Sequence, residues 1–196
     1  MPDVGILALQ GDFGEHASML ESLGARPRLV RKETALNEVD GLIIPGGEST
    51  TICRLMAAFD LLDPLRQFAR SKPVWGTCAG MIVLARRASD LDLPAIGELD
   101  IGVRRNAFGR QLDSFETTLD IPAIGPEPFP AVFIRAPVVD EVGPDVDVLA
   151  RLDDRRIVAV QQGTILATAF HPELTGDSRL HRHFLHMLPV REVHPK

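Results

Sequence analysis

Hydrophobic positions in the first half of the chain form short apolar runs that alternate with segments of helical periodicity. Apolar runs too short for a helix and bounded by turn residues predict strands buried on both faces. They occur at residues 4–9, 28–30, 41–44 and 74–77. Apolar residues three and four positions apart predict helices. Gly24 is expected to end the helix nearest the N-terminus. These helices are expected over 13–23, 50–59, 62–70 and 81–87. The alternation predicts an α/β protein with a mostly parallel sheet between two helical layers.

The second half of the chain changes this rhythm, because short strand patterns crowd together between Gly, Pro and Asp turns. Such spacing favours antiparallel additions to the parallel core. The strands are expected at 101–104, 115–121, 131–134, 146–152, 157–161 and 165–169. A closing helix is predicted over 177–188, and residues 189–196 form a polar tail. No linker composition interrupts the pattern, so residues 1–188 are expected to form one domain.

Composition narrows the class of protein. The chain has 196 residues, of which 45% are hydrophobic and 24% charged, as in an ordinary globular protein. A net charge of −6 argues against nucleic acid as the main partner. Two cysteines are too few for a disulfide framework, and the N-terminus lacks the basic start of a signal peptide. No apolar stretch approaches the roughly 20 residues that span a bilayer. We therefore expect a soluble, cytoplasmic protein without a membrane partner.

The segment around Cys78 is the most informative one. A buried strand ends at Gly76-Thr77-Cys78-Ala79-Gly80, and a helix begins at once. A G-x-C-x-G sequence between strand and helix is typical of a nucleophile elbow, a tight turn that exposes the central side chain. A thiol there is activated more readily than an ordinary one. The alternative is an inert buried cysteine, which is the interpretation we adopt for Cys53.

A thiolate nucleophile needs a base and a group that orients the base. His171 ends an apolar strand and is followed by Pro172 and Glu173. In an extended segment, residues two apart face the same side, so Glu173 is expected to reach the His171 imidazole. The other histidines receive different interpretations. His16 is expected to be structural, those of the last helix to face solvent (His181, His183, His186), and His194 to lie in the tail.

A turn rich in glycine follows the third strand, at residues 45–51. Gly46 and Gly47 allow backbone N–H groups to turn toward a developing oxyanion. The plain alternative is a strand-to-helix turn with Ser49 or Thr50 as the helix N-cap. The spacing of a phosphate-binding loop is absent.

Together these motifs resemble the class I (triad) glutamine amidotransferases, and among them the glutaminase subunits of pyridoxal 5′-phosphate synthase. The G-x-C-x-G and His-Pro-Glu sequences are common to many triad glutaminases. The more specific sequences are GGEST, RNAFGRQ and FIRAP. The matching segments run in family order and lie at residues 9–11, 37–51, 76–80, 105–111, 133–137 and 170–174.

The resemblance implies a role for each matching residue. Cys78 attacks the side-chain amide of L-glutamine, His171 acts first as base and then as acid, and Glu173 orients His171. The oxyanion is held by Ala79 and by Gly46 or Gly47. The residues expected to bind glutamine are Gly47, Glu48, Ser49, Arg105, Ile134 and Arg135. Gln10 is expected at the entrance of the site. No cofactor and no metal is implied.

The resemblance also implies a partner, a separate synthase subunit that uses the ammonia to make pyridoxal 5′-phosphate. We hypothesise that docking on this subunit orients the Gly46–Gly47 peptide for oxyanion binding. Two alternatives stay open: a glutaminase that serves a different synthase, and a non-catalytic regulatory partner. An esterase of the α/β-hydrolase type is disfavoured, because there the acid precedes the histidine in the chain.

Overall fold

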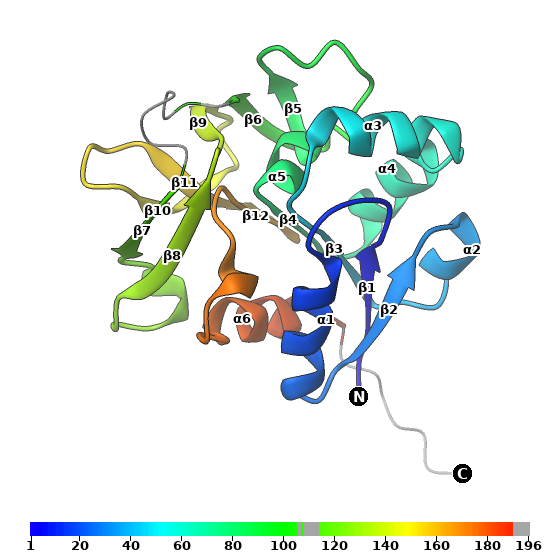
Figure 1. Cartoon of the computed structure of the whole chain (residues 1–196), viewed down its shortest axis with the longest axis horizontal. Helices are drawn as coiled ribbons and strands as arrows, with labels where there is room; N and C mark the ends of the chain where they lie inside the picture. The colour runs from blue at the N-terminus through cyan, green and yellow to red at the C-terminus, as the bar shows by residue number, and fades with distance from the viewer. Residues whose placement is uncertain (106, 108–113, 190–196) are drawn as a thin grey trace.

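A mixed β-sheet runs through the molecule and carries helices against both faces (Figure 1). The computed structural model describes residues 1–105, 107 and 114–189. The elements of the first half are β1 (Asp3–Leu7), α1 (Phe13–Ser22), β2 (Arg26–Val30), α2 (Glu33–Leu36), β3 (Gly41–Ile44), α3 (Ser49–Ala58), α4 (Leu62–Ser71), β4 (Val74–Thr77), α5 (Ala79–Leu84) and β5 (Ala85–Ala88). Those of the second half are β6 (Leu99–Arg104), β7 (Ser114–Leu119), β8 (Phe129–Ile134), β9 (Val138–Val142), β10 (Asp147–Arg151), β11 (Ile157–Gln162), β12 (Ile165–Thr168) and α6 (Arg179–Met187). Two 3-10 helices, η1 (Pro122–Ile124) and η2 (Pro172–Leu174), lie between strands and before α6.

The strand order separates a parallel half from a largely antiparallel half. The order is β2-β1-β3-β4-β12-β11-β9-β6-β5, and β10 pairs with β11. The pairs from β2 to β12 are parallel, whereas β12, β11, β9 and β6 follow one another in antiparallel pairs. Strands β7 and β8 form a separate two-stranded sheet. The predicted α/β class, with a parallel first half and antiparallel additions, is confirmed.

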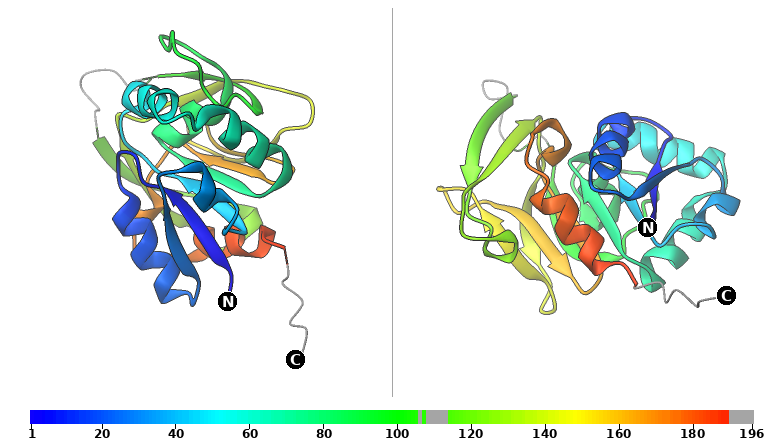
Figure 2. Two further views of the ribbon diagram at one scale, coloured as in Figure 1. Left: turned by 90° about the vertical axis from the view of Figure 1, so that its right-hand side faces the viewer. Right: turned by 90° about the horizontal axis from the view of Figure 1, so that it is seen from below.

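Strand β4 shows how the two faces of the sheet are used. Successive side chains of a strand point to opposite faces. The centroid of the Trp75 ring lies 4.8 Å from that of the His181 ring on α6 and 5.7 Å from that of the His16 ring on α1. Gly76 faces the other way, toward α5. Helices α1 and α6 therefore cover one face, and α3, α4 and α5 lie on the other, as the views in Figures 1 and 2 show.

The contact between β3 and the start of α5 is unusually close. A Cβ atom on Gly80 would fall on the carbonyl oxygen of Ile44 at the end of β3. Gly76 faces the backbone of Gly80 at similarly close range. Glycine at these two positions lets the helix begin directly against the sheet, so that the turn between them is fixed by backbone packing.

Two predictions about this part of the chain need correction. The helix expected over 81–87 ends at Leu84, because Ala85 takes an extended conformation and begins β5. The backbone of β5 pairs in parallel with β6, a partner that local periodicity cannot reveal. Strand β9 and the short helix α2 had no predicted counterpart.

The other expected elements are present with ends shifted by a few residues. The predicted tail, 189–196, lies outside the described residues except for Pro189. In the described part of the chain, every helix is too short or too polar to cross a bilayer.

We expect Gly80→Ala to lower the free energy of unfolding by about 1–3 kcal/mol, because the new methyl group must displace the Ile44 backbone. Urea denaturation measures this change. Gly14→Ala is the matched control, since a Cβ there meets no atom within 4 Å and the residue lies in helix α1. Its unfolding free energy should stay level or rise by up to about 1 kcal/mol. Equal effects in the two variants would contradict the close-packing argument.

Candidate active site

A cavity of about 420 Å³ opens where the parallel strands of the sheet end. Loops that follow β1, β3, β4 and β12 meet there, because the carboxyl ends of parallel strands lie at one edge of the sheet. The volume is within the range of small-molecule sites. The lining residues are Gln10, Asp12, Gly47, Glu48, Ser49, Cys78, Ala79, Ile82, Arg105, Ile134, Arg135 and His171.

Cys78 occupies the turn between β4 and α5 in a strained backbone conformation, with φ of 48° and ψ of −105°. Its N–H donates to the carbonyl of Thr168 at 2.8 Å, which fixes the turn to the end of β12. The sulfur lies 3.7 Å from the carbonyl oxygen of Ile134. The other cysteine, Cys53, is buried on α3 away from the cavity lining, and burial raises the pKa of its thiol to about 11. Of the two thiols, only that of Cys78 is placed to meet a ligand.

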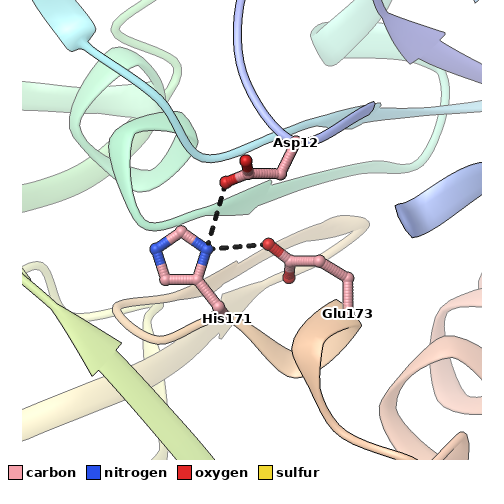
Figure 3. A group of neighbouring side chains, drawn as sticks. All are labelled: Asp12, His171 and Glu173. Atoms are coloured by element: carbon pink, nitrogen blue, oxygen red, sulfur yellow. Dashed lines mark hydrogen bonds and ion pairs between the residues drawn. The ribbon is translucent and has the colours of Figure 1, made fainter. Parts of the chain in front are cut away.

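His171 is buried at the end of the β12 segment and contacts two carboxylates (Figure 3). Its backbone N–H donates to Val132 of β8 at 2.8 Å. Its Nδ1 lies 2.7 Å from Oε1 of Glu173 and 3.5 Å from Oδ2 of Asp12. The contact with Glu173 is the expected one, but the expected extended backbone is wrong. Residues Pro172–Leu174 form the 3-10 helix η2, and this turn brings the carboxylate back to the imidazole.

The electrostatics of this group favour a charged imidazole. Burial by itself lowers the pKa of His171, but its hydrogen bonds and charge interactions with Cys78 and Glu173 outweigh burial and raise the pKa to about 10. Burial raises the pKa of Glu173, against the opposing effect of its bond to His171. A buried imidazole that interacts with both a sulfur and a carboxylate is an arrangement that can serve proton transfer.

Asp12, His171 and Glu173 also offer one nitrogen and carboxylate oxygens within 4.8 Å of one another, which a divalent metal could bind. The Nδ1 atom of His171 is the nitrogen concerned, and it already holds the short contact with Glu173. A metal bound there would take the place of the proton between Nδ1 of His171 and Oε1 of Glu173. Two carboxylates around one ring nitrogen also stabilise an imidazolium, which accounts for the cluster without a metal.

The loop after β3 is held on both sides. A Cβ on Gly46 would collide with Cε1 of His171, so the Gly46 backbone lies directly against the imidazole. The Gly46 carbonyl accepts a hydrogen bond from the N–H of Asp12 at 3.2 Å. The N–H of Glu48 donates to Oε1 of Gln10 at 2.7 Å. The orientation of the Gly46–Gly47 peptide is therefore tied to the loop between β1 and α1.

Glu48 is the N-cap of α3, so the alternative that Ser49 or Thr50 caps this helix is wrong. Its carboxylate accepts from the backbone N–H of Thr50 at 3.0 Å and of Thr51 at 2.7 Å. Partial burial raises the pKa of Glu48, but these hydrogen bonds outweigh burial and lower the pKa to about 2. The cap thus places a fixed negative charge at the rim of the cavity.

Two arginines line the same rim. Arg105 is mostly buried and lies 3.4 Å from both Oε1 of Glu48 and Oγ1 of Thr50. Arg135 is exposed and has a φ of 43°, rare for a residue with a side chain. The other residues of the RNAFGRQ sequence except Ala107, namely 106 and 108–111, lie outside the described part of the chain.

A family model described as the SNO glutamine amidotransferase family matches residues 6–190. The chain belongs to this family. It is 59% identical over 186 residues to the "Pyridoxal 5′-phosphate synthase subunit PdxT" of Herpetosiphon aurantiacus, covering 93% of this chain and 98% of the relative. It is 57% identical over 187 residues to the subunit of the same name from Roseiflexus sp., covering 94% and 99%. A solved structure described as a glutamine amidotransferase superposes with a TM-score of 0.89 at 48% identity, covering 94% of this chain and 97% of that one.

In this SNO family chain, most cavity residues lie in the predicted motifs. Gly46 and Glu173 stand just behind the lining, against His171. Sequence reasoning missed Asp12 and Ile82. Asp12 follows the Leu-Gln-Gly sequence directly, and that position was the available signal.

The histidines of the last helix of this SNO family chain differ from expectation. His181 is fully buried rather than solvent-facing, and His183 is half-buried with Nε2 2.9 Å from Oε1 of Gln161. His186 is exposed as expected. His16 is fully buried, in agreement with a structural role. The spacing of these three histidines along α6 does not match that of a helical metal-binding pair. The spacing alone could not show which face of α6 packs against α1 and β4.

We expect the fold to lose stability as the pH falls from 6.5 toward 4. Burial lowers the pKa of His181 to about 4, so the unfolded chain takes up a proton there before the folded chain does. This single group corresponds to about 3 kcal/mol over that window. In urea titrations, the stability difference between the wild type and His181→Leu should shrink by this amount on acidification. His186→Leu controls for added hydrophobicity. If the difference in unfolding free energy between the wild type and His181→Leu did not change with pH, the assignment would be refuted.

Proposed function

We propose that this chain is the glutaminase subunit of a pyridoxal 5′-phosphate synthase. It hydrolyses L-glutamine to L-glutamate and ammonia and passes the ammonia to a separate synthase subunit. The observation that carries the proposal is the His171 imidazole, which interacts with the Cys78 thiol and the Glu173 carboxylate at the wall of one cavity. The names of the relatives favour this synthase over a different ammonia-using one. The presence of Cys78, His171 and Glu173 in one group argues against a purely regulatory partner.

In the proposed reaction, His171 takes the proton of the Cys78 thiol, and the thiolate attacks the side-chain carboxamide carbon of glutamine. The tetrahedral intermediate collapses as the His171 imidazolium gives its proton to the leaving nitrogen, which departs as ammonia. A glutamyl thioester remains on Cys78. Neutral His171 then takes a proton from water, the hydroxide attacks the thioester, and glutamate leaves with regeneration of the thiolate. Glu173 orients the imidazole throughout and stabilises its charged form.

The developing oxyanion needs donors close to the sulfur. We assign this role to the N–H of Ala79, the residue after the nucleophile, and to the Gly46–Gly47 loop. The contact of Gly46 with the His171 ring supports the assignment, because it sets the loop beside the reacting group. Glycine is required at this point, since any side chain would displace the imidazole.

The amino-acid end of glutamine is assigned to the rim of the cavity, where Gly47, Glu48, Ser49, Arg105, Ile134 and Arg135 line the wall. Guanidinium groups suit the α-carboxylate, and the Glu48 carboxylate suits the α-ammonium group. The low pKa of Glu48 supports this, because the charge is present across the physiological pH range.

The partner is proposed to be the synthase subunit, met in the cytoplasm. Gln10 and Asp12 hold the loop at 46–48 through hydrogen bonds from one side. A partner that presses on the segment around Gln10 would therefore reorient the Gly46–Gly47 peptide. This link gives a physical route by which docking turns on the glutaminase and prevents wasteful hydrolysis.

The first test measures glutamate release from L-glutamine with and without the synthase subunit. The wild type should be active in the complex and far weaker alone, and Cys78→Ala should lose activity by several orders of magnitude. Cys53→Ala is the matched control, because Cys53 is a buried core thiol on α3, and its complex should keep wild-type turnover. Activity that survives in Cys78→Ala would overturn the assignment of the nucleophile.

A second test addresses the amino-acid end of the substrate. Arg135→Met should raise the KM for glutamine about 10–100-fold, because a hydrogen-bonded charge contact is worth about 1.5–3 kcal/mol. Arg135→Lys should recover part of this loss. Arg155→Met is the matched control, since Arg155 is also exposed and also has a positive φ but lies outside the cavity lining. An equal KM in Arg135→Met and Arg155→Met would exclude Arg135 from substrate binding.

A further inference from the structure

A second polar cluster lies behind the cavity, and none of its residues has a role in the proposed reaction. It consists of His16 on α1, Thr77 on β4 and His181 on α6, each with no exposed surface. Nδ1 of His16 lies 3.0 Å from Nε2 of His181, and Nε2 of His16 lies 3.3 Å from Oγ1 of Thr77. Trp75 closes the cluster by edge contacts with both imidazoles. Buried imidazoles of this kind are costly unless they are bonded, so they require an explanation.

The cluster reaches the carboxylate of Glu173. One oxygen, Oε1, is engaged by His171 at 2.7 Å. The other, Oε2, is buried and has no hydrogen-bond partner among the residues that the structure describes. Nε2 of His16 stands 3.4 Å from this oxygen, and both side chains are fully enclosed. The distance is long for a hydrogen bond, yet catalytic contacts often shorten only when substrate binds.

The chemistry of the three groups selects one arrangement of protons. Burial, together with the charges of His181 and His171, lowers the pKa of His16 well below its usual value, so the ring is neutral and carries one proton. An ionised carboxylate only accepts, so His16 can donate to Oε2 only if its proton is on Nε2, where Oγ1 of Thr77 at 3.3 Å is a second acceptor for the same N–H. Nδ1 must then accept, and Nε2 of His181 must donate to it. The remaining atom, Nδ1 of His181, becomes a bare acceptor, in keeping with its lack of a described partner.

We propose that His16 is a positioning residue for Glu173: its Nε2–H donates to Oε2, and His181 fixes the tautomer that makes this possible. The inference rests on the proposed function, since it concerns the orientation of the base in that reaction. Held at one oxygen by His16, the carboxylate presents the other to His171 and cannot rotate away. His16 acts through Glu173 and does not itself line the cavity.

The same donor helps to keep Glu173 ionised. The titratable groups around this carboxylate are His171 from the η2 segment, His16 from α1 and Asp12 from the loop before α1, with Cys78 and His181 one contact further out. Asp12 raises the pKa of Glu173, as burial does, whereas His171 lowers it. Loss of the His16 donor should raise it further. Activity should then fall away at a higher pH on the acid side.

The proton arrangement can be read directly from the imidazole nitrogen signals of the uniformly ¹⁵N-labelled full chain. At neutral pH we expect both His16 and His181 to carry their proton on Nε2. A proton on Nδ1 of His16 would overturn the proposal. This measurement needs no enzymatic activity and no substitution, so it stands even if the complex releases no glutamate and the proposed function fails.

The role in catalysis is tested with His16→Leu and its matched variant His16→Gln, each in complex with the synthase subunit. His16→Leu removes the donor, and we expect kcat to fall about 10–100-fold, as for other lost outer contacts of a reacting group. The KM should stay within about twofold, because His16 does not touch the substrate. The acid limb of the kcat profile should move to higher pH. His16→Gln places an amide N–H near the former Nε2 and should recover most of the rate and the original acid limb.

Two kinetic results would contradict the proposal. One is a folded His16→Leu complex with unchanged kcat and an unchanged acid limb. The other is an equal loss in both variants without a change in pH dependence, which would mean that His16 only fills space. If His16→Leu does not fold, the tautomers of the wild type and the kinetics of His16→Gln still decide the question.

Discussion

The buried contact between Glu173 and His171 is the interaction on which the rest of the site depends. A carboxylate enclosed in protein is strongly destabilised unless positive charge or donors surround it. Here the contact of 2.7 Å with Nδ1 supplies the main compensation, and the backbone bond from His171 to Val132 fixes where the imidazole can be. The carboxylate favours the charged form of the imidazole, which also interacts with the Cys78 side chain. The placement of this one carboxylate therefore favours the charged form of the His171 imidazole.

Helix α1 connects the two halves of this site. The loop before it forms hydrogen bonds with the Gly46 carbonyl and the Glu48 N–H, and the first turn of the helix brings His16 toward Oε2 of Glu173. The oxyanion loop and the base are thus held by one rigid element, packed between β1, β2 and the η2 segment. A small shift of α1 would change both at once. Such a shared support provides a physical link between an event at the cavity entrance and the orientation of the base.

The sequence predicted those features that depend on neighbouring residues. Strands β3 and β4 match their expected bounds, because short buried runs that end at a turn are local signals. The contact of Glu173 with His171 was also local, although a 3-10 turn rather than an extended segment produces it. Features that depend on distant partners could not be predicted. Ala85–Ala88 is a strand only because β6 pairs with it, and the burial of His181 depends on His16, 165 residues away.

The backbone is strained at two residues of the cavity, and the surrounding fold rather than the local sequence holds it there. Cys78 and Arg135 both have positive φ, although glycine would adopt that conformation at far lower cost. Glycine cannot serve at either position if the side chain is what the cavity needs. Neighbouring residues stabilise the strained backbone at Cys78. Gly76 and Gly80 allow the backbones around the turn to approach closely, and the carbonyl of Thr168 accepts a hydrogen bond from the Cys78 N–H. The close backbone contacts thus fall on the glycines beside Cys78, so that Cys78 itself can keep a side chain that lines the cavity.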